Sequence, residues 1–354
     1  MGVGLGFVLL VLSLGTASAS TSPEGPRLAF IKWGPKPNEM ELLSVGFATP
    51  GRQRISGGSK AVRDHSPVPF NHATWSPEGT SIAFAAYFRP KKTEIFIAEP
   101  DGNGLHSVPG TVGGQDPVFA PDGHTIAFAR SRYRQPHFDL HHPLESLGGG
   151  YSSTTTWTIG ANGEGAKRLT SWRNGLYNTP SSFSPDGATL ALSREGRGSH
   201  SAVLMDVSSG RVTLLARHAE EPAYSPDGSR IAFVSYRDRN IDPEGGFDSP
   251  MLVSELYVEN VDGSGLTRIT HTQERQENAP SWDPSGARLA YTQASRHELF
   301  GLGLTNVVME INADGTCPTR VFGKPAKPRD QNFVGLYGPA WQLGPGREAG
   351  PIAC

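Results

Sequence analysis

Three irregular segments of the sequence concentrate the side chains that could do chemistry. The first, 130–153, holds three histidines, His137, His141 and His142. Imidazole nitrogens are common ligands of divalent metal ions, and such an ion could polarise the carboxylate of an acidic sugar. The segment is also rich in proline and glycine, which favours a solvated surface loop over a metal site.

The second irregular segment begins like a calcium-binding loop. Asp238, Asn240 and Asp242 stand at alternate positions and could supply oxygen ligands. Pro243, however, stands where an EF-hand needs a glycine, and Ser249 stands where it needs a glutamate. The pattern therefore does not predict a calcium site, and we expect neither a metal ion nor any other cofactor.

Sequence motifs of the common enzyme classes are missing. The chain contains no G-x-S-x-G, no H-E-x-x-H and no G-x-x-x-x-G-K-S/T. Charged residues make up 19% of the chain and the formal net charge is −2, so no basic field predicts binding to nucleic acid. A serine peptidase, a zinc peptidase of these types and a nucleotide hydrolase are therefore not expected.

A repeated phrase indicates the scaffold that must position the irregular segments. Six near-copies of nine residues begin with S-P-D-G or a variant of it and end in I-A-F or a variant of it. The copies lie at 22–30, 76–84, 120–128, 184–192, 225–233 and 283–291. Self-similarity at a spacing of this kind is the signature of a repeat architecture.

Each phrase predicts a tight turn followed by a buried strand. In the fifth copy Pro226 fixes φ at position i+1 of the turn. Asp227 tolerates the backbone conformation of position i+2, and Gly228 adopts a positive φ. The strand that follows is apolar on both faces, as residues 82–86 of the second copy illustrate. A sheet that is sandwiched between two neighbouring sheets requires this pattern.

The residues around each phrase complete a four-stranded unit. A short strand, often entered through proline, precedes the phrase, and two further short strands follow it, separated by an Asp-Gly or Asn-Gly turn. With 43 glycines and 29 prolines, the chain suits many short strands joined by turns. The sequence therefore predicts an all-β fold, a six-bladed β-propeller of four-stranded antiparallel blades, over residues 20–342.

The two ends of the propeller predict how its ring closes. The first phrase has no strand before it, whereas residues 339–342 look like such a strand with no phrase after it. We therefore expect the C-terminal strand to complete the first blade and close the ring. Closure of this kind removes open sheet edges, which are templates for aggregation.

The N-terminus and the cysteines both indicate export. Residues 1–19 carry no charge, contain an apolar stretch and end in an A-x-A pattern, which predicts a cleaved signal peptide and no transmembrane anchor after cleavage. We therefore expect a secreted or periplasmic protein. In an oxidising compartment Cys317 and Cys354 can persist as a disulfide, which would tie back the tail 343–354.

The S-P-D-G turns, I-A-F strands, D-G turns and L-T or I-T endings resemble the repeats of TolB-type six-bladed propellers. The resemblance covers nearly all of residues 20–342 and implies the propeller without the separate amino-terminal α/β domain of TolB. TolB is a periplasmic accessory of the Tol–Pal envelope system and binds other proteins through its propeller. Prolyl-oligopeptidase-like peptidases and oligogalacturonate lyases contain similar repeats, so the repeat alone does not select a function.

The three irregular segments, 130–153, 235–253 and 292–305, follow the second strand of their blades, and they should project from the face where each first strand begins. We call this the long-loop face, and we call the opposite face, which carries the S-P-D-G and D-G turns, the turn face. Connections into the first strands add Asp116, Glu220 and Glu221 to the long-loop face. Long loops on a rigid scaffold commonly carry binding sites.

We therefore expect a non-catalytic propeller that binds a protein partner through its long-loop face. The alternative is a metal-assisted lyase or hydrolase that acts on a carbohydrate at the pore. The predicted partner-binding residues are Arg132, Tyr133, Arg134, His137, Arg237, Asp238, Arg239, Asn240, Asp242 and Arg296.

Two further residue types recur in the repeats and predict structural roles. An arginine follows the second strand of several blades, and its regularity favours hydrogen bonds to neighbouring loop carbonyls. An aromatic residue recurs at the end of each first strand and favours packing around the ring. These aromatic residues are Trp75, Phe119, Phe183, Tyr224, Trp282 and Trp341.

Overall fold

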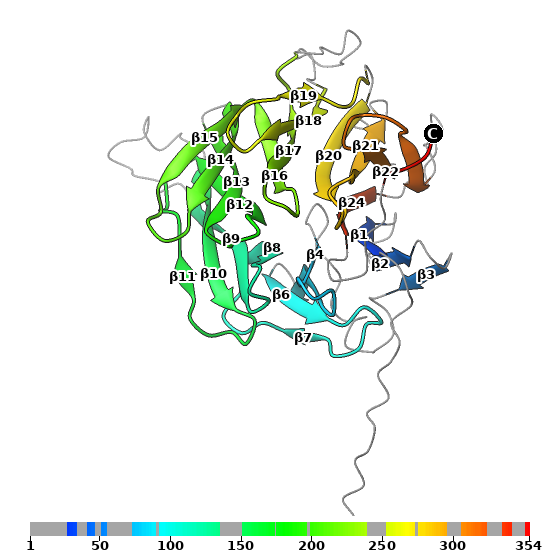
Figure 1. Cartoon of the computed structure of the whole chain (residues 1–354). Coiled ribbons are helices and arrows are strands. Elements are labelled where there is room, and N and C mark those ends of the chain that lie inside the picture. The colour runs from blue at the N-terminus through cyan, green and yellow to red at the C-terminus, as the bar shows by residue number, and fades with distance from the viewer. Residues whose placement is uncertain are drawn as a thin grey trace, which may run out of the picture.

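The strands of the chain form antiparallel blades that follow one another around a ring, as the computed structural model shows (Figure 1). The structure describes residues 27–33, 41–46, 51–54, 73–89, 92–134, 151–173, 175–196, 199–238, 253–272, 275–295, 306–323, 335–341 and 351–354. Each described blade has four strands, and blades that are consecutive in the chain contact each other.

Three of the blades are continuous in sequence and form separate four-stranded sheets. The second blade consists of β4 (Thr74–Trp75), β5 (Ile82–Arg89), β6 (Lys92–Ala98) and β7 (His106–Ser107). The fifth consists of β16 (Ala219–Tyr224), β17 (Arg230–Ser235), β18 (Glu255–Asn260) and β19 (Thr267–Arg268). The sixth consists of β20 (Arg275–Trp282), β21 (Arg288–Ser295), β22 (Asn306–Asn312) and β23 (Thr319–Phe322).

The third and fourth blades are joined into one eight-stranded sheet. The third consists of β8 (Gly114–Phe119), β9 (Thr125–Arg134), β10 (Tyr151–Gly160) and β11 (Lys167–Arg168). The fourth consists of β12 (Leu176–Phe183), β13 (Thr189–Gly196), β14 (Ser199–Asp206) and β15 (Val212–Arg217). A parallel bridge between Thr154 of β10 and Tyr177 of β12 links them, while each blade keeps the predicted strand order.

The first blade contains both ends of the propeller, as the sequence predicts. Its order is β24 (Gly335–Trp341), β1 (Arg27–Trp33), β2 (Glu41–Gly46) and β3 (Gly51–Arg54), and β24 lies beside β1 in Figure 1. Leu28 pairs with Trp341, and Ala29 pairs with Ala340. The C-terminal strand begins at residue 335, four residues earlier than the expected 339–342.

The five turn phrases whose turns the structure describes adopt the predicted tight turns. In the fifth blade the amide of Gly228, at φ 72°, donates to the carbonyl of Ser225 over 2.9 Å. The Asp227 carboxylate accepts from the hydroxyls of Ser225 and Ser229. These hydrogen bonds lower the pKa of Asp227 to about 2, so the side chain stabilises the turn in its charged form.

The hydrophobic core lies between the blades. Ile231, Ala232 and Phe233 of β17 are all fully buried, which the apolar pattern of the phrase predicts. One core cluster combines Ala232 of the fifth blade with Tyr291 of the sixth. Small alanines between large side chains let neighbouring sheets approach closely, so the packing extends from blade to blade around the ring.

The recurrent tryptophans pack in the core and also connect neighbouring blades. The indole Nε1 of Trp282 donates to the carbonyl of Ala223 in the preceding blade over 3.0 Å. The guanidinium of Arg230 lies 4.6 Å from the centroid of the Trp282 ring and donates to the carbonyl of Gly286 over 2.7 Å. At Trp282 a hydrogen bond and a cation–π contact therefore fix the sixth blade against the fifth.

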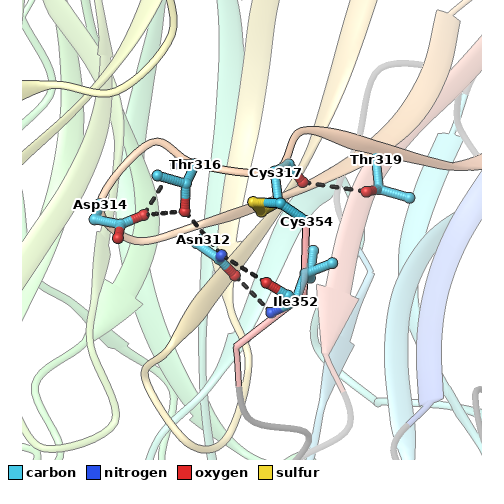
Figure 2. Close-up of a disulfide and its surroundings, with 7 residues drawn as sticks. All are labelled: Asn312, Asp314, Thr316, Cys317, Thr319, Ile352 and Cys354. Carbon is cyan, nitrogen blue, oxygen red and sulfur yellow. Dashed lines mark hydrogen bonds between the residues drawn. A yellow bond between two sulfur atoms is a disulfide. The ribbon is translucent and has the colours of Figure 1, made fainter.

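A disulfide joins Cys317, in the turn before β23, to Cys354 at the C-terminus. Figure 2 shows Asn312 beside it, holding the tail by its backbone. The side-chain nitrogen Nδ2 of Asn312 donates to the Ile352 carbonyl over 3.0 Å. The backbone amide of Ile352 donates to the side-chain oxygen of Asn312 over 2.7 Å. The predicted pairing of the two cysteines is therefore confirmed.

Replacement of both cysteines by serine should lower the free energy of unfolding by roughly 4 kcal/mol, because the disulfide closes a long loop and restricts the unfolded chain. The two cysteines are 37 positions apart in the sequence. Denaturant titration of the oxidised protein and of the double variant measures the difference. Thiol titration of the natively produced protein under denaturing, non-reducing conditions should find no free thiol, and two free thiols would contradict the pairing.

Candidate functional site

A central cavity of about 450 Å³ lies where the innermost strands of all six blades meet. Of its 28 lining residues ten are prolines, from the X-Pro steps of the innermost strands and from the S-P-D-G turns, and six are the recurrent aromatic residues. Asp116 and Glu221 are acidic, and no described lining residue is lysine, arginine or histidine. The described wall is therefore mostly apolar, and two carboxyl groups are its ionisable side chains apart from Tyr224.

The two acidic residues lie at bulges of the innermost strands. The strand register shifts in β8, β12, β16, β20 and β24. Asp116 in β8, Glu221 in β16 and Ala279 in β20 each precede a proline and adopt positive φ angles of 48°, 53° and 55°. This conformation costs about 1 to 3 kcal/mol for a residue other than glycine. Such a conformation persists only where the surrounding structure holds it.

Hydrogen bonds between blades hold these bulges. The amide of Ala279 donates to Glu221 Oε2 over 2.5 Å, and the amide of Glu221 donates to the hydroxyl of Ser193 over 2.8 Å. The hydroxyl of Ser182 donates to the Pro222 carbonyl and accepts from the amide of Tyr224, each over 3.0 Å. Amide groups beside the cavity are therefore used to join one blade to the next.

A polar cluster lies at the beginning of the innermost strand of the fifth blade. Nδ1 of His200 in β14 is hydrogen-bonded to the carboxylate of Glu220 in β16, and the hydroxyl of Tyr236 lies 3.5 Å from Glu220 Oε2. Burial raises the pKa of Glu220, and His200 opposes that shift. Burial and the nearby glutamates also raise the pKa of Tyr236. The cluster joins the fourth blade to the fifth.

A second polar network lies within the fifth blade. The Asp238 carboxylate accepts from the hydroxyl of Tyr257 and pairs with Arg268 over 2.8 Å, and Arg268 also donates to Glu255 over 2.6 Å. The guanidinium of Arg237 lies 4.8 Å from the centroid of the Tyr257 ring. Arg237 and Asp238 therefore hold the base of the loop in place, and their side chains are engaged within the blade.

Two of the recurrent arginines make hydrogen bonds within the fold, and one of these bonds goes to a loop carbonyl, as the spacing predicts. Arg130 donates to the carbonyl of Gly110 over 2.5 Å and lies 4.7 Å from the centroid of the Trp157 ring. Nε of Arg194 donates to the side-chain oxygen of Asn178 over 2.8 Å. Each of these arginines joins the second strand of its blade to a neighbouring strand or loop.

The structure describes part of the predicted partner-binding set. Arg132 is exposed and its guanidinium lies 6.0 Å from the centroid of the Trp172 ring. The backbones of Tyr133 and Arg134 end β9 and pair with β10. The remaining predicted residues lie outside the described residues, namely His137, Arg239, Asn240, Asp242 and Arg296.

Sequence reasoning placed Asp116, Glu220 and Glu221 on the long-loop face, but it missed that two of them line the cavity. The cluster around His200 was missed entirely. The prolines in the first strands could have indicated these bulges. A proline restricts the backbone of the residue before it, so a proline at the same position in several blades predicts a repeated irregularity there.

The described residues contain neither a cluster of metal ligands nor a helix that could span a membrane. That part of the chain contains no group of three or more His, Cys, Asp or Glu side chains placed to hold a metal ion. The predicted candidates His137, His141 and His142 lie outside it. In the same part of the chain, no helix has the length and apolarity needed to cross a bilayer.

Comparison with known proteins shows the fold. No family model and no curated protein matches the sequence. TolB from Acinetobacter baumannii superposes with a TM-score of 0.61 at 17% identity, covering 90% of this chain and 66% of that one, slightly less than two thirds. A putative TolB from Agrobacterium tumefaciens gives a TM-score of 0.56 at 18% identity, covering 88% of this chain and 98% of that one.

A chain of a nidogen–laminin complex gives a TM-score of 0.57 at 12% identity, covering 90% of this chain and 99% of that one. At these identities the likeness extends to the fold, a β-propeller of the kind seen in TolB and in other six-bladed propellers. The expected architecture is therefore confirmed.

Proposed function

From the premise of a TolB-like propeller, we propose that this chain is an exported, non-catalytic scaffold of the cell envelope or exterior. It binds a protein partner through its long-loop face and the central cavity beneath it. The disulfide supports export, because such bonds persist in oxidising compartments outside the cytoplasm. Secretion and a periplasmic location are both consistent with it.

The composition of the cavity wall carries this proposal. Prolines, aromatic residues and small residues dominate the described lining, which suits the side chains of an inserted protein segment. Within the alternative of a metal-assisted lyase or hydrolase acting on a carbohydrate, a lyase of acidic sugars would need cationic groups or a metal ion to hold its substrate. The described lining offers two carboxyl groups and no cationic side chain, and carboxylates would repel such a substrate.

Alanine substitutions at Arg134, His137, Arg239 and Asp242 should weaken partner binding and leave the melting temperature nearly unchanged. A few anchors usually carry most of the energy of an interface, at about 2 kcal/mol or more each. The partner is first captured from the native exported fraction with the immobilised propeller and identified by mass spectrometry. Binding of the purified partner to each variant is then measured by calorimetry.

The matched controls are Asp101→Ala and Asp262→Ala in turns between third and fourth strands, on the turn face. Both aspartates are exposed, and their carboxylates accept hydrogen bonds within their own turns. These controls should leave partner binding intact. If the control substitutions alone weaken binding, the partner uses the turn face and the assignment of the long-loop face is wrong.

A further inference from the structure

The described wall of the central cavity carries carboxyl groups as its only ionisable side chains other than tyrosine. Asp116 in the third blade and Glu221 in the fifth line it together, and lysine, arginine and histidine are absent from the described lining. His72, at the corresponding position of the second blade, lies outside the described residues. Walls of low dielectric focus the field of such charges, which favours the entry of a cationic group.

The same wall is poor in hydrogen-bond donors. Its ten prolines have no amide hydrogen, yet each keeps a carbonyl oxygen. Several other amides around the ring are already used between blades: those of Tyr224 and Trp341 donate to the hydroxyls of Ser182 and Ser281, and that of Ala279 donates to Glu221. An occupant that brings its own donors therefore complements the wall better than an acceptor does.

The apolar part of the wall suits a long aliphatic stem. Phe183 and Tyr224 line the cavity and are only half-buried, so part of each side chain remains accessible. Arginine and lysine bury their methylene groups against apolar surface while the charged end reaches polar groups. A cation also gains from the face of an aromatic ring.

We infer that the cavity receives an arginine or lysine side chain from an inserted segment of the partner protein. The negative charges of Asp116 and Glu221 attract its charged end, and the aromatic and proline side chains pack against its stem. The inference rests on the proposed function and adds the chemistry that the site recognises. A cavity of about 450 Å³ has room for a side chain of this size.

Two conservative substitutions remove the negative charge and keep the local structure. Asp116→Asn is compatible with the positive φ at this position, because asparagine adopts that conformation more readily than most residues. Glu221→Gln keeps a side-chain oxygen that can accept from the amide of Ala279. The matched control removes two exposed carboxylates from the turn face by Asp262→Asn and Asp314→Asn.

The test uses three fluorescein-labelled heptapeptides of sequence Gly-Pro-Gly-X-Gly-Pro-Gly, in which X is arginine, citrulline or glutamate. Citrulline has nearly the shape of arginine but no charge. Fluorescence anisotropy with the full-length oxidised protein should show the arginine peptide binding about tenfold more tightly than the citrulline peptide. Citrulline lacks the positive charge that the carboxylates of the cavity would attract. The glutamate peptide should bind most weakly. The double variant Asp116→Asn with Glu221→Gln should lose the preference, and the turn-face control should keep it.

Equal binding of the arginine and citrulline peptides, or binding of none of the three, would overturn the inference. A preference that survives in the double variant would also overturn it. The proposed function fails separately, by failure to capture a partner or by binding through the turn face. If a captured partner binds the double variant as tightly as the original protein while the long-loop substitutions weaken it, the proposed function stands and the cationic occupant is excluded.

Discussion

A chain that ends at Gly338 will fail to fold into a stable propeller. The deletion removes the last three residues of β24, which pair with β1 and complete the first blade. Trp341 is only 2% exposed, and loss of a buried side chain of this size alone costs about 3 to 5 kcal/mol. The total stability of a domain is about 5 to 15 kcal/mol, so further loss of strand pairing should abolish folding.

Circular dichroism and thermal unfolding of the truncated chain measure this effect. Because the deletion also removes Cys354, the matched control is a chain that ends at Gln342, which loses the same disulfide and keeps β24. The control should still fold, with its free energy of unfolding lowered by the roughly 4 kcal/mol expected for loss of the disulfide. A chain ending at Gly338 that melts at the same temperature as this control would show that the ring does not depend on its C-terminal strand.

Glu277→Gln will make the protein more stable in alkaline solution. Glu277 in β20 is fully buried, and burial together with the nearby carboxylate of Glu255 raises its pKa to about 8. The folded protein therefore holds a proton that the unfolded chain releases near pH 4.5. The contribution of this proton to the free energy of unfolding is fully present below pH 4.5 and is lost as the pH rises to about 8. The total loss is about 5 kcal/mol.

Glutamine reproduces the protonated carboxyl group and removes this loss. Nε2 of Gln293 donates to Glu277 Oε1 over 2.9 Å, and the hydroxyl of Thr272 lies 2.9 Å from the same oxygen. A glutamine side chain can keep both contacts. Urea unfolding at pH 5, 7 and 9 should therefore give a difference between the variant and the original protein that grows with pH.

Glu99→Gln serves as the control, because Glu99 is exposed. It should change stability equally at the three pH values. If Glu277→Gln gives a pH-independent difference, Glu277 is already ionised in the folded protein. The substitution would then act through packing alone.

The repeated phrase explains why so much of the fold could be predicted. Turn geometry at Pro226 and Gly228, burial of the strand that follows, and strand order within a blade all depend on residues close together in the sequence. The missing first strand and the unpaired last strand likewise predicted the pairing of β24 with β1. Even the disulfide followed from two cysteines near the same end of the chain.

The candidate site could be predicted only in part. Asp116 and Glu221 were expected in the connections that lead into the first strands, whereas the structure places them inside β8 and β16, where they line the cavity. Their approach to the cavity, and the positive φ that brings them there, were not visible in the sequence. A single residue before proline does not reveal whether its strand is bulged.

By itself, then, the sequence determined the all-β class, the number of blades and the closing strand, because local turn chemistry and strand periodicity encode each of them, and it determined the disulfide because the chain has only two cysteines. Only the tertiary structure decided which side chains meet between blades. The indole of Trp282 reaches the carbonyl of Ala223, and Glu221 holds the amide of Ala279, across 59 and 58 positions of sequence. Contacts of this kind depend on how closely and at what angle two sheets pack, and that geometry is set by the summed volumes of all the side chains between them.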